Sequence, residues 1–284
     1  MTNNYFDDKE YISNSMLNDF FKLTKTWKKY YTPDLYYRLH VLNLWKLEQT
    51  EAMKVWSIVD EYFADWVDVF DKYKVADWRT KEWKQLKEVF PEVCVSQNVI
   101  DRVELLINAL SKDETFMVIV KQSEKQAILK WVYEFTDNET WEIVSIKIKG
   151  KPDFIDYEWK VIVDLKTTSN FETLLNDMQW QLKPIINHKY FRQLAIYNFL
   201  SWQQNNCYLA IADDTNTYID NDWKKFWRTK WIKVRQSILD KALESVFEDI
   251  RELYKYQKNN WQLLEEIDIF ETDNNLDNED ELWI

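Results

Sequence analysis

VIVDLKTT, at residues 161–168, is an apolar run that ends in an acid and a lysine. Successive side chains of a β-strand point to opposite faces, so Asp164 and Lys166 share one face with Ile162. The other face carries only the aliphatic side chains of residues 161, 163 and 165. Burying a charged pair costs free energy. The stretch therefore predicts a strand whose polar end serves a function.

A second acid lies one polar turn earlier in the chain. Gly150-Lys151-Pro152-Asp153 precedes the turn at 156–160, and a hairpin through that turn brings Asp153 beside Asp164. Two neighbouring carboxylates repel each other unless a cation lies between them, and hard oxygen ligands suit Mg²⁺ or Mn²⁺. The lysine can then orient a water molecule or stabilise charge on a phosphate. The pattern is short, and taken alone it is more typical of a surface hairpin with an ordinary ion pair.

The surrounding segments predict an α/β fold. Runs rich in strand-forming residues at 127–135, 143–155 and 160–167 are separated by polar turns, which predicts a three-stranded antiparallel meander. Apolar residues at helical spacing predict helices on both sides, and a short apolar run predicts a further strand. The helices are expected at 50–65, 97–111, 189–201 and 231–257, the further strand at 207–212, and an N-terminal helix after a cap at Ser13 or Ser15.

Four ordered motifs resemble those of the PD-(D/E)xK nuclease superfamily, most closely its RecE or exonuclease VIII type. They are G-x-P-D at 150–153, D-L-K-T-T at 164–168, Gln193 with Tyr197 on one helix face, and V-W-S-I-V-D at 55–60. The last motif matches the family's G-S-h-h-H pattern if Trp56 is read as glycine. The segments at 11–15 and 79–84 also match, so the resemblance spans roughly residues 11–263.

The resemblance implies a restriction-endonuclease-like core with extra N- and C-terminal helices, in one exonuclease domain over residues 1–263. The implied reaction is metal-dependent hydrolysis of DNA phosphodiester bonds, by 5′→3′ digestion of double-stranded ends in recombination. Asp153 and Asp164 would bind Mg²⁺ or Mn²⁺, with the Leu165 carbonyl as a third ligand. Lys166 would act on the water nucleophile.

Three further positions take their roles from the resemblance. Gln193 and Tyr197 would position the DNA or support the metal site. Asp60 stands where relatives usually place a metal-binding histidine, and aspartate is also a competent hard ligand. The alternative for Asp60 is an exposed helix acid beside Glu61.

The expected partners also follow from the resemblance. They are double-stranded DNA ends, a single-strand annealing protein and further copies of the chain, because RecE-like enzymes form rings around DNA. The acidic N-terminus does not read as a signal peptide, and no apolar run has the length of a membrane span, so a cytoplasmic, phage-type enzyme is expected. Two alternatives stay open: a RecB or CRISPR-associated nuclease without an iron–sulfur cluster, since the chain has 2 cysteines, and a non-catalytic DNA-end-binding protein on the same fold.

The charge is unevenly distributed along the chain. The net charge is −12, but residues 264–284 contain 9 acids and no base, which leaves 37 basic against 40 acidic residues, a net of −3, in residues 1–263. The end of the chain is therefore expected to be a solvated, disordered acidic tail. Basic clusters that could contact phosphate lie at 22–29, 79–87 and 224–235, although solvated helix faces explain each of them equally well.

The glycine and tryptophan contents are both abnormal. Average usage of about 7% would give roughly 20 glycines, whereas the chain has 1 glycine and 16 tryptophans. Several tryptophans end polar turns, where glycine is the usual residue. We therefore expect that UGA codons meaning glycine in the source are printed as tryptophan; the alternative is a chain naturally rich in tryptophan. The positions most affected would be Trp56, Trp83, Trp141, Trp159 and Trp261.

Overall fold

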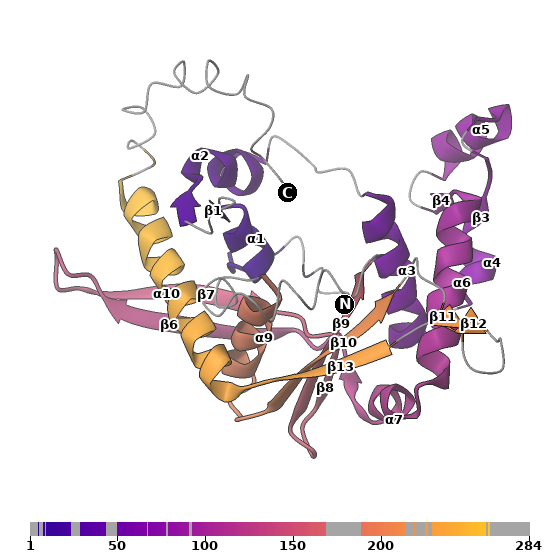
Figure 1. Ribbon diagram of the computed structural model, residues 1–284. Helices are drawn as coiled ribbons and strands as arrows, with labels where there is room; N and C mark the ends of the chain where they lie inside the picture. The colour runs from indigo at the N-terminus through magenta and orange to yellow at the C-terminus, as the bar shows by residue number, and fades with distance from the viewer. Residues whose placement is uncertain are drawn as a thin grey trace.

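The computed structural model describes residues 5, 8, 10–23, 29–43, 50–66, 68–77, 79–90, 93–168, 189–213, 218–219, 225–226, 229–259 and 261. At its centre lies a five-stranded mixed sheet in the order β13-β10-β9-β8-β5 (Figure 1). β9 and β10 run parallel, and the other neighbours are antiparallel. The α/β class predicted from the sequence is confirmed. The strands are β5 (Glu124–Lys125), β8 (Phe154–Asp156), β9 (Val161–Thr168), β10 (Asn206–Asp213) and β13 (Thr229–Val234).

Helices cover both faces of the sheet (Figure 1). Leu165 faces the core that the first group of helices completes, and Ile162 faces the core of the second group. Because alternate residues of β9 enter different cores, Asp164 and Lys166 point toward the second group. The first group is α3 (Glu51–Asp65), α6 (Gln97–Lys112) and α7 (Glu114–Gln122), and the second is α9 (Lys189–Leu200) with α10 (Gln236–Lys258).

The predicted meander is divided between two sheets. β6 (Leu129–Thr136) and β7 (Ile143–Gly150) form a separate antiparallel ribbon, and the run expected at 143–155 breaks into β7 and β8. Pro152, in the break, has no N–H to donate to a strand ladder. The neighbouring Asp153 carboxylate instead accepts the backbone N–H of Leu165 at 2.6 Å. The break therefore places Asp153 just before β8.

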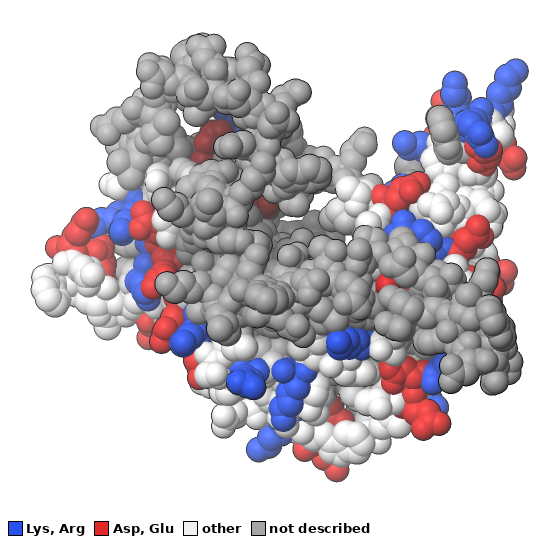
Figure 2. All heavy atoms as spheres, in the orientation of Figure 1, with Lys and Arg blue, Asp and Glu red and all other residues white. Residues whose placement is uncertain are grey.

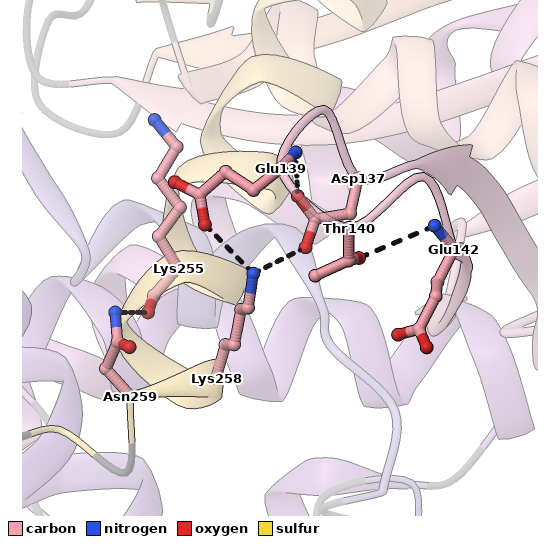
Figure 3. Close-up of polar contacts among 7 residues, drawn as sticks. All are labelled: Asp137, Glu139, Thr140, Glu142, Lys255, Lys258 and Asn259. Atoms are coloured by element: carbon pink, nitrogen blue, oxygen red, sulfur yellow. Dashed lines mark hydrogen bonds and ion pairs between the residues drawn. The ribbon is translucent and has the colours of Figure 1, made fainter.

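The tip of the β6–β7 ribbon is fastened to the end of α10 (Figure 3). The Lys258 ammonium donates to Asp137 at 2.8 Å and to Glu139 at 2.9 Å. Further along the ribbon, Tyr133 stacks on Phe247 of α10 with ring centroids 4.0 Å apart. Polar contacts at the tip and aromatic contacts along the strands thus hold the ribbon against the helix.

The predicted helix at 231–257 is wrong at its start. Residues 231–234 belong to β13, in which Ile232 pairs with Leu209 of β10, and α10 begins at Gln236. The edge of β10 offers hydrogen bonds to these residues, and helical periodicity along the sequence does not reveal that edge. Of the two caps predicted for the N-terminal helix, Ser13 and Ser15, the helix uses Ser13, whose hydroxyl accepts the N–H of Met16.

The remaining elements are short. No helix among the described residues is long and apolar enough to cross a membrane. The predicted acidic tail at 264–284 lies outside the described residues, as do the side chains of the basic cluster at 22–29. The elements are α1 (Asn14–Asn18), β1 (Phe21–Leu23), β2 (Lys29–Tyr31), α2 (Pro33–Tyr36), η1 (Tyr37–Val41), α4 (Val69–Lys72), β3 (Lys74–Val75), α5 (Lys81–Val89), β4 (Cys94–Val95), β11 (Tyr218–Ile219) and β12 (Lys225–Phe226).

Several tryptophans adopt a backbone conformation that suits glycine. In the described part of the chain, 7 non-glycine residues have positive φ, and four of them are Trp66, Trp141, Trp202 and Trp261. A bulky side chain is rare in the left-handed region, whereas glycine enters it freely. Trp159 differs, since the positive φ in its turn belongs to the next residue, Lys160, at 51°.

Candidate active site

The pairing of β8 with β9 brings two acids together. Phe154 pairs with Val163, so the same antiparallel register, continued by one residue, sets Asp153 opposite Asp164. The Asp153 carboxylate is anchored by the N–H of Leu165. Asp164 is 0% exposed and Asp153 4% exposed. The structure thus places the two predicted carboxylates side by side in the protein interior.

Lys166 completes this cluster. Its ammonium lies 2.6 Å from Oδ2 of Asp164 and 5.2 Å from the ring centre of Tyr190 on α9. Burial lowers the pKa of Lys166, but the charges of Asp164 and Asp153 outweigh burial and raise it overall. The lysine is therefore charged at neutral pH and is held by the carboxylates.

Burial raises the pKa values of the two carboxyl groups. Burial raises the pKa of Asp153 well above its ordinary value, and the charges of Asp164 and Asp60 raise it further. Burial also raises the pKa of Asp164, against the opposing effect of Lys166. Oδ1 of Asp164 and Oδ1 of Asp60 are buried and have no hydrogen-bond partner among the described residues. Buried oxygens of this kind are suited to bind a cation.

Asp60 reaches the same region from α3. It is 6% exposed, so the alternative of an exposed helix acid is wrong. Gln126 donates a hydrogen bond from Nε2 to Oδ2 of Asp60 and accepts one at Oε1 from Lys151 at 3.1 Å. Burial raises the pKa of Asp60 to about 6, and Lys151 and Lys166 oppose that shift. The carboxylate is thus buried, near the other two acids, and fixed on one side by Gln126.

Trp56 occupies the remaining side of this region. Its indole Nε1–H donates to the Leu165 carbonyl at 3.0 Å. This is the carbonyl for which the family resemblance implies a metal-binding role. Among the described residues, no three His, Cys, Asp or Glu side chains are grouped closely enough to hold a metal ion. The carboxylate and carbonyl oxygens of this region are the ligand type that a hard cation prefers. As they are arranged around Trp56, however, the acidic side chains of the described residues do not group into a metal site.

Gln193 and Tyr197 lie together on α9, as predicted. Gln193 donates to the Tyr197 hydroxyl. Burial raises the pKa of Tyr197 well above its ordinary value, and the charges of Asp164 and Asp153 act in the same direction. Gly150 packs against this helix so closely that an added Cβ would lie 2.7 Å from Cδ1 of Tyr197. The chain's one glycine thus lets β7 approach the tyrosine.

Three residues of this cluster were not predicted from the sequence. Gln126 contacts Asp60, and Lys151 contacts Gln126, only after β5 and β8 pair. Tyr190 contacts Lys166 only after α9 packs on β9. Lys151 lies within the G-K-P-D motif, which was a usable signal. Gln126 has a left-handed backbone, with φ of 52°, and no local pattern marks it.

A family model described as a PDDEXK-like domain of unknown function, DUF3799, matches residues 26–263. The chain belongs to this family. Nucleases of the PD-(D/E)xK kind generally use divalent metal ions, which agrees with the oxygen-rich cluster around Asp153 and Asp164. Family and fold together support a nuclease, that is, a hydrolase.

Three solved structures similar to this chain are described as exonucleases. A protein from Eubacterium rectale, described as a candidate exonuclease, has 22% identity and a TM-score of 0.63 over 92% of this chain and 87% of its own. That likeness supports the fold alone. A phage-related exonuclease from Haemophilus somnus has 15% identity and a TM-score of 0.30, over 90% of this chain and 96% of its own. An alkaline exonuclease from Laribacter hongkongensis has 12% identity and a TM-score of 0.29, over 72% and 93%. A comparison with curated proteins finds no match.

Proposed function

We propose that this protein is a Mg²⁺- or Mn²⁺-dependent deoxyribonuclease that digests double-stranded DNA from its ends in the 5′→3′ direction. One observation carries the proposal. Asp153, just before β8, and Asp164, within β9, lie side by side, with the Lys166 ammonium 2.6 Å from Asp164. Together with membership of a PDDEXK-like family, this cluster supports phosphodiester hydrolysis.

The roles of these residues follow from their chemistry. Asp153 and Asp164 supply oxygen ligands, and Lys166 orients the attacking water or stabilises negative charge on the phosphate. A bound divalent cation would supply Lewis-acid stabilisation of the phosphate oxygens. Asp60, fixed by Gln126, and the Leu165 carbonyl add hard oxygen donors. Gln193 and Tyr197 support the site from α9, where they bond to each other.

Exposed basic residues supply surfaces for the DNA backbone. Figure 2 shows Lys and Arg side chains gathered over α5 at one end of the molecule, where Lys81, Lys84 and Lys87 are exposed. Lys230 and Lys233 on β13 are exposed as well. Lysines on open surfaces attract phosphate without reading base sequence. The proposal therefore expects binding that weakens with salt and depends little on sequence.

The biological setting proposed here rests on the family resemblance. The enzyme would act in the cytoplasm as a homo-oligomer at DNA ends during recombination, beside a single-strand annealing protein. A RecB or CRISPR-associated nuclease without an iron–sulfur cluster would share the cluster. A non-catalytic DNA-end-binding protein would not need Asp153, Asp164 and Lys166 all together.

Digestion of labelled DNA tests the proposal. Linear duplexes labelled at the 5′ or the 3′ end, and a closed circular duplex, are incubated with Mg²⁺ and one of two proteins. One is the chain with tryptophan at position 56, called the printed chain below, and the other is its Trp56→Gly variant. The variant is included because Trp56 bonds the Leu165 carbonyl. Release of 5′ label from the linear duplex, with the circle intact, is the expected result. No cleavage by either protein would contradict a nuclease, and early release of 3′ label would contradict the polarity.

A further inference from the structure

Trp56 and Asp60 lie on the same face of α3. They are four residues apart, so their side chains are neighbours on the helix surface. That face is directed at the end of β9: the indole of Trp56 donates to the Leu165 carbonyl at 3.0 Å, and its ring centre lies 5.7 Å from the Lys166 ammonium. A large aromatic group therefore stands among the residues of the candidate site.

The Leu165 carbonyl lies on an edge of β9 that no strand among the described residues covers at this position. β8 pairs with β9 from Val161 to Val163 and reaches no further. In a strand, the N–H and C=O of one residue point to the same edge. On this edge the N–H of Leu165 is taken by the Asp153 carboxylate, and the C=O is taken by the Trp56 indole. Without the indole, the carbonyl would be free to bind a cation.

The backbone indicates that tryptophan replaces glycine in this chain. Trp66, Trp141, Trp202 and Trp261 all have positive φ, between 54° and 63°. Glycine is the residue that takes this conformation without strain. With 1 glycine against 16 tryptophans in the sequence, a systematic exchange of glycine for tryptophan explains both numbers. Trp56 lies in helix α3, so its φ does not discriminate between glycine and tryptophan. The relevant observation at this position is its contact with Leu165 and Lys166.

We infer that the indole of Trp56 fills the space in which a divalent cation would meet the Leu165 carbonyl, and that the active protein has glycine at position 56. The inference rests on the proposed function and deepens it. Removing the indole leaves three oxygens free among the described residues: Oδ1 of Asp60, Oδ1 of Asp164 and the carbonyl of Leu165.

Binding of Mn²⁺ to the full chain tests this inference without reference to activity. The free-ion signal in electron paramagnetic resonance is followed during Mn²⁺ titration of the printed chain and of Trp56→Gly. We expect Trp56→Gly to bind Mn²⁺ more tightly by about 10- to 100-fold, the range found when the surroundings of metal ligands change. Asp164→Asn in the Trp56→Gly chain should remove the gain. Equal affinity of the two proteins would overturn the inference.

Two further variants separate volume from other effects. Trp56→Phe removes the N–H but keeps a ring, so it should bind Mn²⁺ as weakly as the printed chain; binding as tight as that of Trp56→Gly would overturn the claim of a filled space. Trp141→Gly, at an exposed ribbon turn with φ of 63°, makes the same exchange away from the site and should not change affinity. An equal gain from Trp141→Gly would also overturn the inference.

Folding and catalysis are measured on the same samples. Circular dichroism checks each variant, and Trp56→Ala, which favours helix more than glycine does, repeats the test if Trp56→Gly does not fold. DNA cleavage distinguishes this inference from the proposed function. Tight Mn²⁺ binding by Trp56→Gly without cleavage would contradict the nuclease and leave the inference standing. DNA cleavage by Trp56→Gly with no gain in Mn²⁺ affinity would support the nuclease and overturn the inference about Trp56.

Discussion

Two buried ion pairs on either side of α9 show how a structural pair differs from a functional one. Lys166 and Asp164 lie 2.6 Å apart at the end of β9, and Arg192 and Asp249 lie 2.7 Å apart between α9 and α10. Asp164, Arg192 and Asp249 are all 0% exposed. Burial and distance therefore do not distinguish the two pairs.

The groups that surround the two ion pairs do distinguish them. Around the Arg192 pair, the Ser245 hydroxyl accepts from the guanidinium at 3.1 Å and the Tyr31 hydroxyl donates to Asp249 at 3.3 Å. Around the Lys166 pair, the next group is another carboxylate, Asp153, and burial and mutual repulsion raise its pKa. Oδ1 of Asp164 has no hydrogen-bond partner in the described part of the chain. The Arg192 pair is thus bordered by two hydroxyls that hydrogen-bond to it, whereas the Lys166 pair is bordered by a second buried acid.

The largest expected effect is the loss of catalysis on changing Asp164. In the Trp56→Gly chain, Asp164→Asn should slow DNA cleavage by about 10²- to 10³-fold, the range found when one group that stabilises transition-state charge is removed, because Asp164 is a proposed ligand of the cation that supplies this stabilisation. The free energy of unfolding should stay equal or rise, because one of several neighbouring buried carboxylates is removed. Cleavage rates and urea unfolding measure the two effects. Cleavage near the parent rate would remove Asp164 from the site.

The same substitution at the other pair should have the opposite pattern. Asp249→Asn leaves Arg192 buried without its counter-charge, which should destabilise the fold by about 3–5 kcal/mol. The double variant Arg192→Leu with Asp249→Leu should recover much of this loss, because neither charge is then left alone. Urea unfolding of the three proteins provides the test. A loss below about 1 kcal/mol, the value typical of exposed pairs, would erase the contrast between the pairs.

A smaller effect is expected at Gly150, beside the functional pair. A Cβ there would lie 2.7 Å from Cδ1 of Tyr197 and 2.9 Å from Cδ1 of Leu200. Gly150→Ala should therefore cost about 1–3 kcal/mol of stability through overpacking, and it should reduce cleavage by displacing Tyr197. Ser145→Ala, at an exposed position of the same strand, is the matched control. Equal stability of Gly150→Ala and its parent would show that Tyr197 has room to move.

The smallest effect belongs to a third pair, Lys258 and Asp137, at the tip of the β6–β7 ribbon. Lys258 lowers the pKa of Asp137 through their hydrogen bond (Figure 3). A carboxyl with a lowered folded-state pKa stabilises the fold above its unfolded value of about 3.9 and loses that effect as pH falls through the folded value. Asp137→Asn should therefore lower the urea midpoint slightly at neutral pH and not at all in strong acid. A difference that persists unchanged into acid would assign it to packing instead.

The local sequence pattern was sufficient for the central strand and its polar end. The alternation in VIVDLKTT places Asp164 and Lys166 on one face, and the structure has them there, on the side of α9. The sequence pattern does not predict the break before β8, because the break depends on a hydrogen bond to the Asp153 carboxylate from the backbone N–H of Leu165, 12 positions further along the chain, on β9. Residues 231–234 were likewise misassigned, because β10 provides the edge that makes them a strand.

Contacts between distant segments set the rest of the site. Gln126 reaches Asp60 across 66 positions of the chain, and Trp56 reaches Leu165 across 109. No periodicity or motif encodes such distances. The composition did predict that tryptophan occupies positions suited to glycine, and the positive φ of Trp141 and Trp261 agrees with it.

The most direct measurement is end-labelled duplex digestion by the Trp56→Gly chain with and without Mg²⁺, beside the same chain carrying Asp164→Asn. The account predicts cleavage that requires Mg²⁺, begins at DNA ends and disappears with Asp164→Asn while the variant remains folded. Cleavage that persists without Mg²⁺, or that survives Asp164→Asn unchanged, would contradict the assignment of Asp153, Asp164 and Lys166 as the active site.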